Sequence, residues 1–135
     1  MVYLTRKEHF NAAHKLYNPN WTEEKNLAVF GKCANHNFHG HNYELYVTVK
    51  GQPHPDTGYI MDAKHLGNLM NKYICDELDH KNLNTQVPFL SNLMPTTENV
   101  AKAIFHRLKP HITEAELHCV KLVETEKIFV EYYGE

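Results

Sequence analysis

The stretch HGHNYELYVTVKG, residues 39–51, decides the fold that this sequence predicts. Its Tyr, Val and Thr residues favour extended backbone, and it is the clearest strand in the chain. Toward the N-terminus, residues 2–14 alternate loosely and carry apolar side chains of one parity, which predicts another strand. Toward the C-terminus, residues 117–124 and 128–133 form a last pair of strands around a short turn.

Two amphipathic helices are expected between these pairs of strands. Asp62 can cap the first, and its apolar residues recur at the three-four spacing of one helix face. They are Leu66, Leu69, Met70, Tyr73, Ile74 and Leu78. Thr96 and Thr97 open the second helix. Its apolar face carries Val100, Ala103, Ile104 and Leu108. The order strand, strand, helix, helix, strand, strand predicts an α+β fold, a four-stranded antiparallel sheet with two helices on one face.

Such a sheet has exposed edges and one uncovered face, so subunits are expected to associate. The segment 17–38 holds many turn formers and is expected to be a long loop, and a loop of that length in a compact domain is usually functional. No repeat, low-complexity tract or linker interrupts residues 1–135, which are therefore expected to form a single domain.

Composition and charge exclude several classes of protein. Of the 135 residues, 42% are hydrophobic and 22% are charged, which is an ordinary globular balance. The net charge of -2 gives no basic footprint for nucleic acid, and no apolar run approaches the roughly 20 residues that span a bilayer. The start, MVYLTRKEHF, has no signal-peptide stretch, so a cytoplasmic location is expected. An odd count of 3 cysteines argues against a disulfide framework.

Among 11 histidines, three are candidate metal ligands. His39 and His41 stand two apart on the clearest strand, so both imidazoles point to the same face. His14 ends the first strand and could lie beside them if the two strands pair. Three neutral imidazoles leave one position open on tetrahedral zinc, as in catalytic sites, although imidazole also suits copper, iron or nickel. The pair could instead be exposed polar residues, and His36 could compete as a ligand.

Other polar residues could supply acid–base chemistry. Cys33 lies in a loop beside a lysine, where a thiolate would be favoured as a base or nucleophile, or it is an ordinary reduced thiol. Asp79 and His80 follow the first helix and could relay protons, or His80 is simply a helix-terminal histidine. Glu124, near a strand end, is either solvated or a pocket carboxylate that grips a guanidine-like edge.

Six motifs, in order along nearly the whole chain, resemble the 6-pyruvoyl tetrahydropterin synthase family, which includes the bacterial 6-carboxy-tetrahydropterin synthases. The motifs are FNAAHKL, FGKCANHNFHGHNYELYVTVKG, DTGYIMD, LDHKNLN, PTTENVA and VETEKIFVEYYGE. The resemblance implies a T-fold (tunnelling fold), whose subunits join their sheets into a barrel, usually two stacked trimers, with active sites between subunits. A homo-oligomer, a trimer or a hexamer built as a dimer of trimers, is the partner expected.

Carried over by position, the resemblance also implies a role for each candidate residue. It implies Zn²⁺ ligands at His14, His39 and His41, and a catalytic thiol at Cys33 with Asp79 and His80 as its partners in proton transfer. It implies a carboxylate at Glu124 that anchors the pterin ring, with Thr96, Thr97 and Glu98 helping to build that pocket.

The implied reaction eliminates triphosphate from 7,8-dihydroneopterin triphosphate and gives 6-pyruvoyl-tetrahydropterin. The same substrate could instead give 6-carboxytetrahydropterin and acetaldehyde, on the way to deazapurines such as queuosine. His36 and Phe38 replace residues that are often Pro and Gly in animal pyruvoyl enzymes, whereas the spacing from Cys33 to His39 is typical of the pyruvoyl type. A metal-binding module without catalysis is the remaining alternative, and it predicts no triphosphate release.

Overall fold

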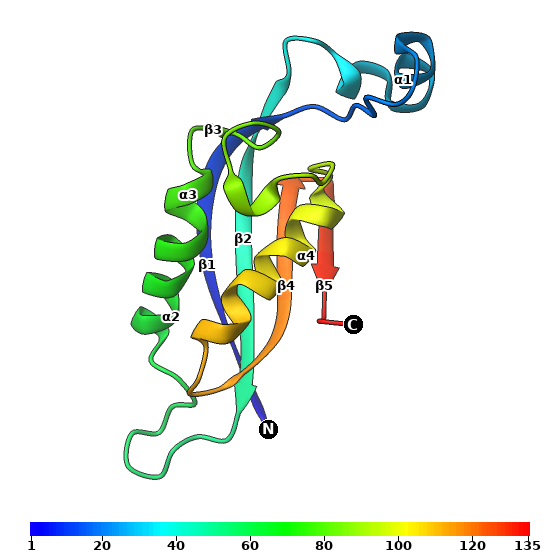
Figure 1. Cartoon of the computed structure of the whole chain (residues 1–135). Helices are drawn as coiled ribbons and strands as arrows, with labels where there is room; N and C mark the ends of the chain where they lie inside the picture. Colours follow the sequence, from blue (N-terminus) through cyan, green and yellow to red (C-terminus); the bar gives the residue numbers. More distant parts are fainter.

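The computed structural model describes residues 1–135 and is built on one five-stranded sheet (Figure 1). The strands are β1 (Val2–His14), β2 (His39–Gly51), β3 (Lys81–Asn82), β4 (Glu116–Thr125) and β5 (Ile128–Tyr132). Their order across the sheet is β3-β1-β2-β4-β5. Neighbouring strands pair antiparallel except β3, which runs parallel to β1, so the sheet is mixed.

Helices α2 (Ala63–Met70) and α4 (Thr97–Leu108) cover one face of the sheet, whereas α1 (Glu23–Phe30) projects beyond its end (Figure 1). Asp62 accepts a hydrogen bond from the backbone N–H of Lys64 and caps α2. Thr96 accepts one from the backbone N–H of Asn99 and caps α4. The helices are α1 (Glu23–Phe30), α2 (Ala63–Met70), which continues through the π-helical turn Asn71–Cys75 into α3 (Asp76–Leu78), and α4 (Thr97–Leu108). None of them is long and apolar enough to cross a membrane.

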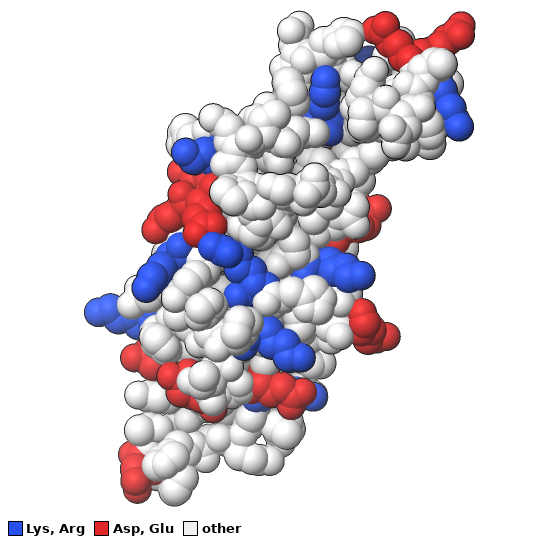
Figure 2. Space-filling model, in the orientation of Figure 1, with Lys and Arg blue, Asp and Glu red and all other residues white.

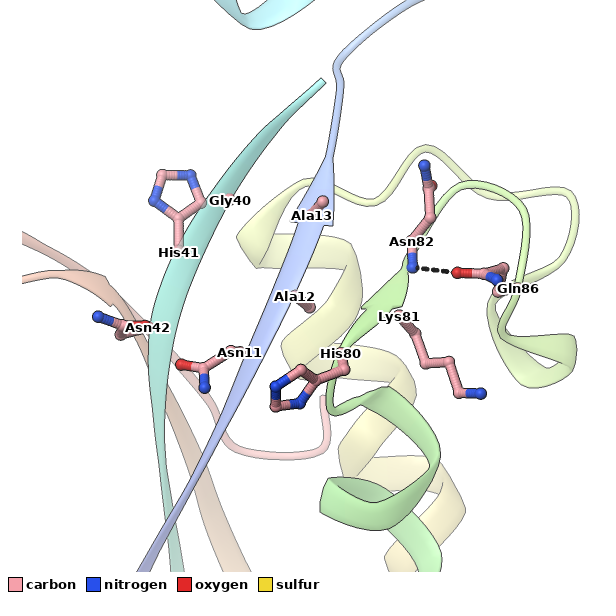
Figure 3. A pocket seen from close by; sticks show the side chains of 10 residues that line it. All are labelled: Asn11, Ala12, Ala13, Gly40, His41, Asn42, His80, Lys81, Asn82 and Gln86. Carbon is pink, nitrogen blue, oxygen red and sulfur yellow. Dashed lines mark hydrogen bonds between the residues drawn. The ribbon is translucent and has the colours of Figure 1, made fainter. Parts of the chain in front are cut away.

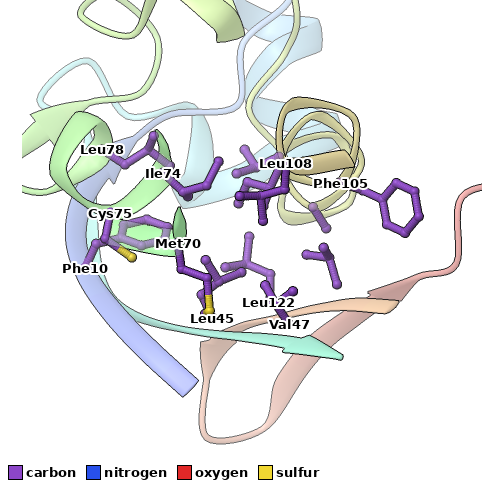
Figure 4. Packing of buried hydrophobic residues seen from close by; sticks show 14 of the residues in the cluster. Phe10, Leu45, Val47, Met70, Ile74, Cys75, Leu78, Phe105, Leu108 and Leu122 are labelled. Carbon is purple, nitrogen blue, oxygen red and sulfur yellow. The ribbon is translucent and has the colours of Figure 1, made fainter. Parts of the chain in front are cut away.

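The hydrophobic core lies between the sheet and the helices (Figure 4). Phe10 on β1 and Leu45 and Val47 on β2 are fully buried in this layer. Met70 from α2 and Leu108 from α4 belong to the same cluster. Burying one such side chain contributes about 1.5–3 kcal/mol, so this layer fixes which way every second strand residue points.

The opposite face of the sheet carries no helix (Figure 1). Lys7, His9 and Asn42, which alternate with core positions on β1 and β2, are exposed there, and Lys7 Nζ lies 3.4 Å from Glu44 Oε1. On the helix-bearing side, Figure 2 shows basic and acidic side chains interspersed rather than gathered by sign. That side therefore offers no basic stripe of the kind that binds nucleic acid.

The α+β class and the predicted order of the main strands and helices are confirmed. The fifth strand, β3, was not expected. It forms because the N–H of His80 donates to the carbonyl of Asn11 at 2.6 Å, which lays the following residues along β1. The contact joins residues distant in the sequence, so no local pattern announces it.

Segment 17–38, expected to be a loop, contains helix α1. The Thr22 hydroxyl caps this helix, and the rings of Trp21 and Phe30 stack with centroids 5.7 Å apart. Its one buried residue is Asn26, so the helix lacks the apolar stripe that periodicity detects.

Candidate metal centre

Three imidazoles meet where β1 ends and β2 begins. The antiparallel ladder pairs His14 with His39, and His41 follows on the same face of β2. The ring centroids are 4.6 Å apart for His14 and His39, 5.1 Å for His14 and His41, and 4.9 Å for His39 and His41. One ligand atom from each ring and a carboxylate oxygen of Glu124 all lie within 4.8 Å of one another. Nitrogen and oxygen atoms at this separation can surround one metal ion.

His14 is held in the orientation that a metal ligand needs. It is 1% exposed, and its Nδ1 donates a hydrogen bond to the carbonyl oxygen of Pro95 at 2.7 Å. Because a carbonyl only accepts, the proton sits on Nδ1 and the lone pair of Nε2 faces the cluster. Metal-bound histidines are usually supported in this way from their far nitrogen.

The Nε2 atom of His41 is buried and forms no hydrogen bond. It lies 2.9 Å from Oε1 of Glu124, but the two atoms are not aligned as donor and acceptor. An unpaired buried nitrogen costs about 1–3 kcal/mol, whereas coordination would use its lone pair. The cluster therefore fits a metal ion better than it fits a network of hydrogen bonds.

The surroundings also favour neutral imidazole, the form that binds a metal. Burial lowers the pKa of His39, and the neighbouring rings of His14 and His41 lower it further. Burial lowers the pKa of His41 as well, against the opposing effect of the Glu124 carboxylate. Protons therefore compete less for these nitrogens than for those of exposed histidines.

Glu124, expected in a substrate pocket, lies against the imidazole cluster, near the end of β4. Its Oε1 is 2.9 Å from Nε2 of one imidazole and 3.6 Å from Nε2 of another. The hydroxyl of Thr97, which is 3% exposed, donates to its Oε2 at 2.7 Å. Thr96 and Glu98 do not take part in these contacts, because the Thr96 hydroxyl caps α4 and Glu98 is exposed in its first turn.

Asp79 and His80 form a contacting pair, with His80 Nδ1 2.9 Å from Asp79 Oδ2. The other oxygen of Asp79 accepts the backbone N–H of Asn11 at 2.8 Å. That hydrogen bond, and then the one to His80, lowers the pKa of Asp79. The carboxylate therefore stays ionised and can hold the proton of His80 Nδ1, which turns Nε2 outward as the exchanging atom.

The Asp79–His80 pair lies beside β1 at the edge of the sheet, just before β3. His80 lines a hollow with Asn11 and Asn42, and His41 borders this hollow on β2 (Figure 3). Asn11 and Asn42 alternate with buried core residues and so point away from the helices. The side chain of His80 is 78% exposed and is not part of the metal-ligating group. Within one chain, the pair thus lies outside the ligating group, although His41 borders the hollow that His80 lines.

Cys33 lies in the 3₁₀ turn Gly31–Ala34 that follows α1 and is a free, half-buried thiol. Its carbonyl accepts the N–H of Leu16 at 2.7 Å, which ties the turn to the chain just beyond His14. No hydrogen bond joins it to the Asp–His pair. His36, the alternative ligand, instead contacts Glu23 Oε1 at 2.8 Å and lies outside the cluster.

Sequence reasoning missed three supports of the site, namely Pro95, Asn11 and Tyr43. The first two act through backbone atoms, which every residue offers, so the sequence carries no signal for them. The sequence does carry a signal for Tyr43, because this residue follows His39 and His41 at every second position of β2 and so shares their face. Its hydroxyl is 3.4 Å from His14 Nδ1, and burial raises its pKa, so the phenol stays protonated beside the cluster.

The chain is similar over nearly its whole length to proteins of named activity. A family model described as 6-pyruvoyl tetrahydropterin synthase matches residues 3–135. The 6-pyruvoyl tetrahydrobiopterin synthases of Pongo abelii and Homo sapiens are 43% and 42% identical over 132 residues, 98% of this chain and 91% of each relative. The solved structure of the Caenorhabditis elegans 6-pyruvoyl tetrahydropterin synthase is 36% identical and has a TM-score of 0.93, covering 99% of this chain and 96% of that one.

Proposed function

The chain belongs to the 6-pyruvoyl tetrahydropterin synthase family, and we propose that it is a zinc-dependent lyase. It would eliminate triphosphate from 7,8-dihydroneopterin triphosphate and give 6-pyruvoyl-tetrahydropterin. The observation that carries this proposal is the cluster of His14, His39 and His41. Three imidazoles with room for a further ligand are typical of catalytic zinc.

The residues around the cluster would divide the chemistry. Zinc would act as a Lewis acid that makes the C–H and O–H protons of the pterin side chain easier to remove. Cys33, as a thiolate, would take one proton, and His80, oriented by Asp79, would return one as triphosphate leaves. Each proton transfer by a placed group contributes typically about 10²–10⁴-fold to the rate.

Glu124 would anchor the pterin through its amino-pyrimidine edge. The Thr97 hydroxyl, 2.7 Å from the carboxylate, supports this role because it holds the side chain in place. Thr96 and Glu98 would complete the pocket from the first turn of α4. A carboxylate grips a guanidine-like edge with two parallel hydrogen bonds, which gives both affinity and orientation.

Each active site would be shared between copies of the chain in a trimer or hexamer. The exposed position of His80 at the edge of the sheet supports this arrangement, since a neighbouring copy can reach it there. Mixing the inactive variants Cys33→Ala and His80→Ala tests it. If the two residues serve one site from different chains, reassembled mixtures should regain about a quarter of wild-type activity, because random mixing leaves about one site in four intact. Mixtures that stay inactive would contradict shared sites.

Mass spectrometry of the products from 7,8-dihydroneopterin triphosphate tests the reaction itself. The proposal predicts inorganic triphosphate and 6-pyruvoyl-tetrahydropterin in equal amounts. Formation of 6-carboxytetrahydropterin and acetaldehyde would assign the carboxy-forming reaction instead. Metal-loaded protein that releases no triphosphate would contradict any lyase of this family.

A further inference from the structure

We propose that Glu124 closes the fourth position of the metal in the resting enzyme, and that a bound pterin withdraws it. The inference rests on the proposed function, because it uses the same carboxylate as the anchor of the pterin ring. It adds a switch: the metal stays closed until the pterin ring has docked. Three observations on the contacts of Glu124 lead to it.

The first observation is the position of Oε1 among the imidazoles. Zinc–nitrogen and zinc–oxygen bonds are about 2.0–2.2 Å, so the ligands of a tetrahedral ion lie roughly 3.3–3.6 Å apart. Oε1 lies 3.6 Å from His14 Nε2, at the upper end of this range, and 2.9 Å from His41 Nε2, which is shorter than the range. The oxygen therefore lies beside two of the three imidazoles and within 4.8 Å of the ligand atom of the third, close enough to serve as a further ligand of one ion.

The second observation concerns the same pair of atoms, Oε1 and His41 Nε2, which are poorly aligned for a hydrogen bond. At 2.9 Å the two atoms are close enough for a hydrogen bond, yet their geometry is not that of one. His14 Nε2 also offers a lone pair, because the proton of that ring is on Nδ1. Lone pairs that converge on one point repel each other unless a cation lies between them, which is the arrangement of ligands around a metal.

The third observation is the hydrogen bond from Thr97 to Oε2 at 2.7 Å. Both oxygens of Glu124 are then engaged, one toward the imidazoles and one with the hydroxyl. A guanidine-like edge needs both oxygens of a carboxylate for its paired hydrogen bonds. Closing the metal and gripping the pterin would therefore compete for the same two oxygens, and pterin binding is expected to draw Oε1 away from the metal.

Measurements of metal affinity test the closing ligand without any turnover. Zinc affinity is determined by competition with a chelating dye for the wild type, Glu124→Gln and Glu124→Asp, with Glu126→Gln as the matched control. Glu126 is exposed two residues further on. Glutamine has the same shape but is a poor ligand, and aspartate keeps the charge but is one methylene too short. Both Glu124 variants should bind zinc at least about tenfold more weakly, and the control should match the wild type.

Circular dichroism of each variant shows whether it has folded before its affinity is compared. Glu124→Asp is the gentler change, so it carries the comparison if Glu124→Gln does not fold. Wild-type affinity in a folded Glu124 variant would overturn the closing ligand.

The visible spectrum of the cobalt-substituted protein tests the withdrawal. The probe is a reduced pterin that lacks the side-chain hydroxyls through which the substrate would bind the metal. Its binding, followed independently by calorimetry, should change the cobalt bands of the wild type, because a carboxylate leaves the ion, and should leave those of Glu124→Gln unchanged. Pterin that binds the wild type without changing the cobalt bands would overturn the switch.

These outcomes are distinct from a failure of the proposed function. If Glu124 does not anchor the pterin, calorimetry shows equal pterin affinity in the wild type and Glu124→Gln, whatever the metal affinities are. If Glu124 anchors the pterin but does not close the metal, pterin affinity falls in the variant while zinc affinity stays at the wild-type value.

Discussion

Removing the metal should lower the thermal stability of this protein, and the histidine cluster determines by how much. A ligand that binds only the folded chain stabilises it by about 2.7 kcal/mol when its free concentration is 100-fold above its Kd. In a chain of 135 residues this corresponds to a change in Tm of roughly 10 °C. Part of that energy arises because coordination pairs the buried Nε2 of His41, which otherwise costs about 1–3 kcal/mol.

Calorimetric melting of the protein with buffered zinc, and again with an excess of chelator, measures this difference. His41→Ala should abolish the shift, because one ligand of the cluster is gone, and its Tm should be the same in both buffers. His54→Ala is the matched control, since His54 is exposed on the loop after β2 and should keep the full shift. A His41→Ala protein that still gains stability from zinc, or a wild type that gains none, would refute the assignment of the cluster as a metal site.

Three further predictions concern the thiol, its turn and the histidine pKa values. Cys33→Ala should keep its zinc, measured by metal analysis, and lose turnover by about 10²–10⁴-fold; near-normal turnover would contradict the role of the thiol. Gly31→Ala places a side chain at φ 57°, ψ −133°, so the free energy of unfolding measured with denaturant should fall by about 1–3 kcal/mol. Turnover should fall more than zinc affinity, and an unchanged free energy of unfolding would contradict the strain. The lowered pKa values of His39 and His41 mean that the unfolded chain takes up protons first as the pH falls. The metal-free protein should therefore keep its stability above pH 6.5 and lose it progressively below, relative to a variant with both His39→Ala and His41→Ala. Parallel profiles of stability against pH for the two proteins would exclude this linkage.

The part of the site that lies on β1 and β2 could be predicted from the sequence. Alternation along a strand is local, so the two histidines of β2 had to share a face. Once the strands pair from end to end, His14 falls opposite His39. The position of Glu124 could not be predicted in this way, because it depends on the register of β4, which shifts between Thr48 and Val49 of its partner strand. It also depends on a hydroxyl from another element, that of Thr97.

The turn that leads into β2 shows a conflict between local preference and the fold. Phe38 has φ 64°, a left-handed conformation that costs a residue other than glycine roughly 1–2 kcal/mol. The ammonium group of Lys15 lies 4.9 Å from the centre of the Phe38 ring and 4.9 Å from that of Tyr17. Contacts of this kind contribute about 0.5–1 kcal/mol each and offset part of the cost. The strain is therefore tolerated immediately before the candidate metal ligand His39, where the chain must turn sharply to begin the strand.

The helix-covered face and the edge of the sheet serve different needs. The helix-covered face excludes water and lowers the pKa of imidazoles, which suits a metal ligand. The edge leaves His80 in contact with solvent, which suits a group that must exchange protons. Within one chain, only His41 of the cluster borders the hollow that His80 lines, so His14 and His39 do not share that hollow with His80. A second copy of the sheet removes this obstacle, so catalysis and association depend on each other in the proposed enzyme.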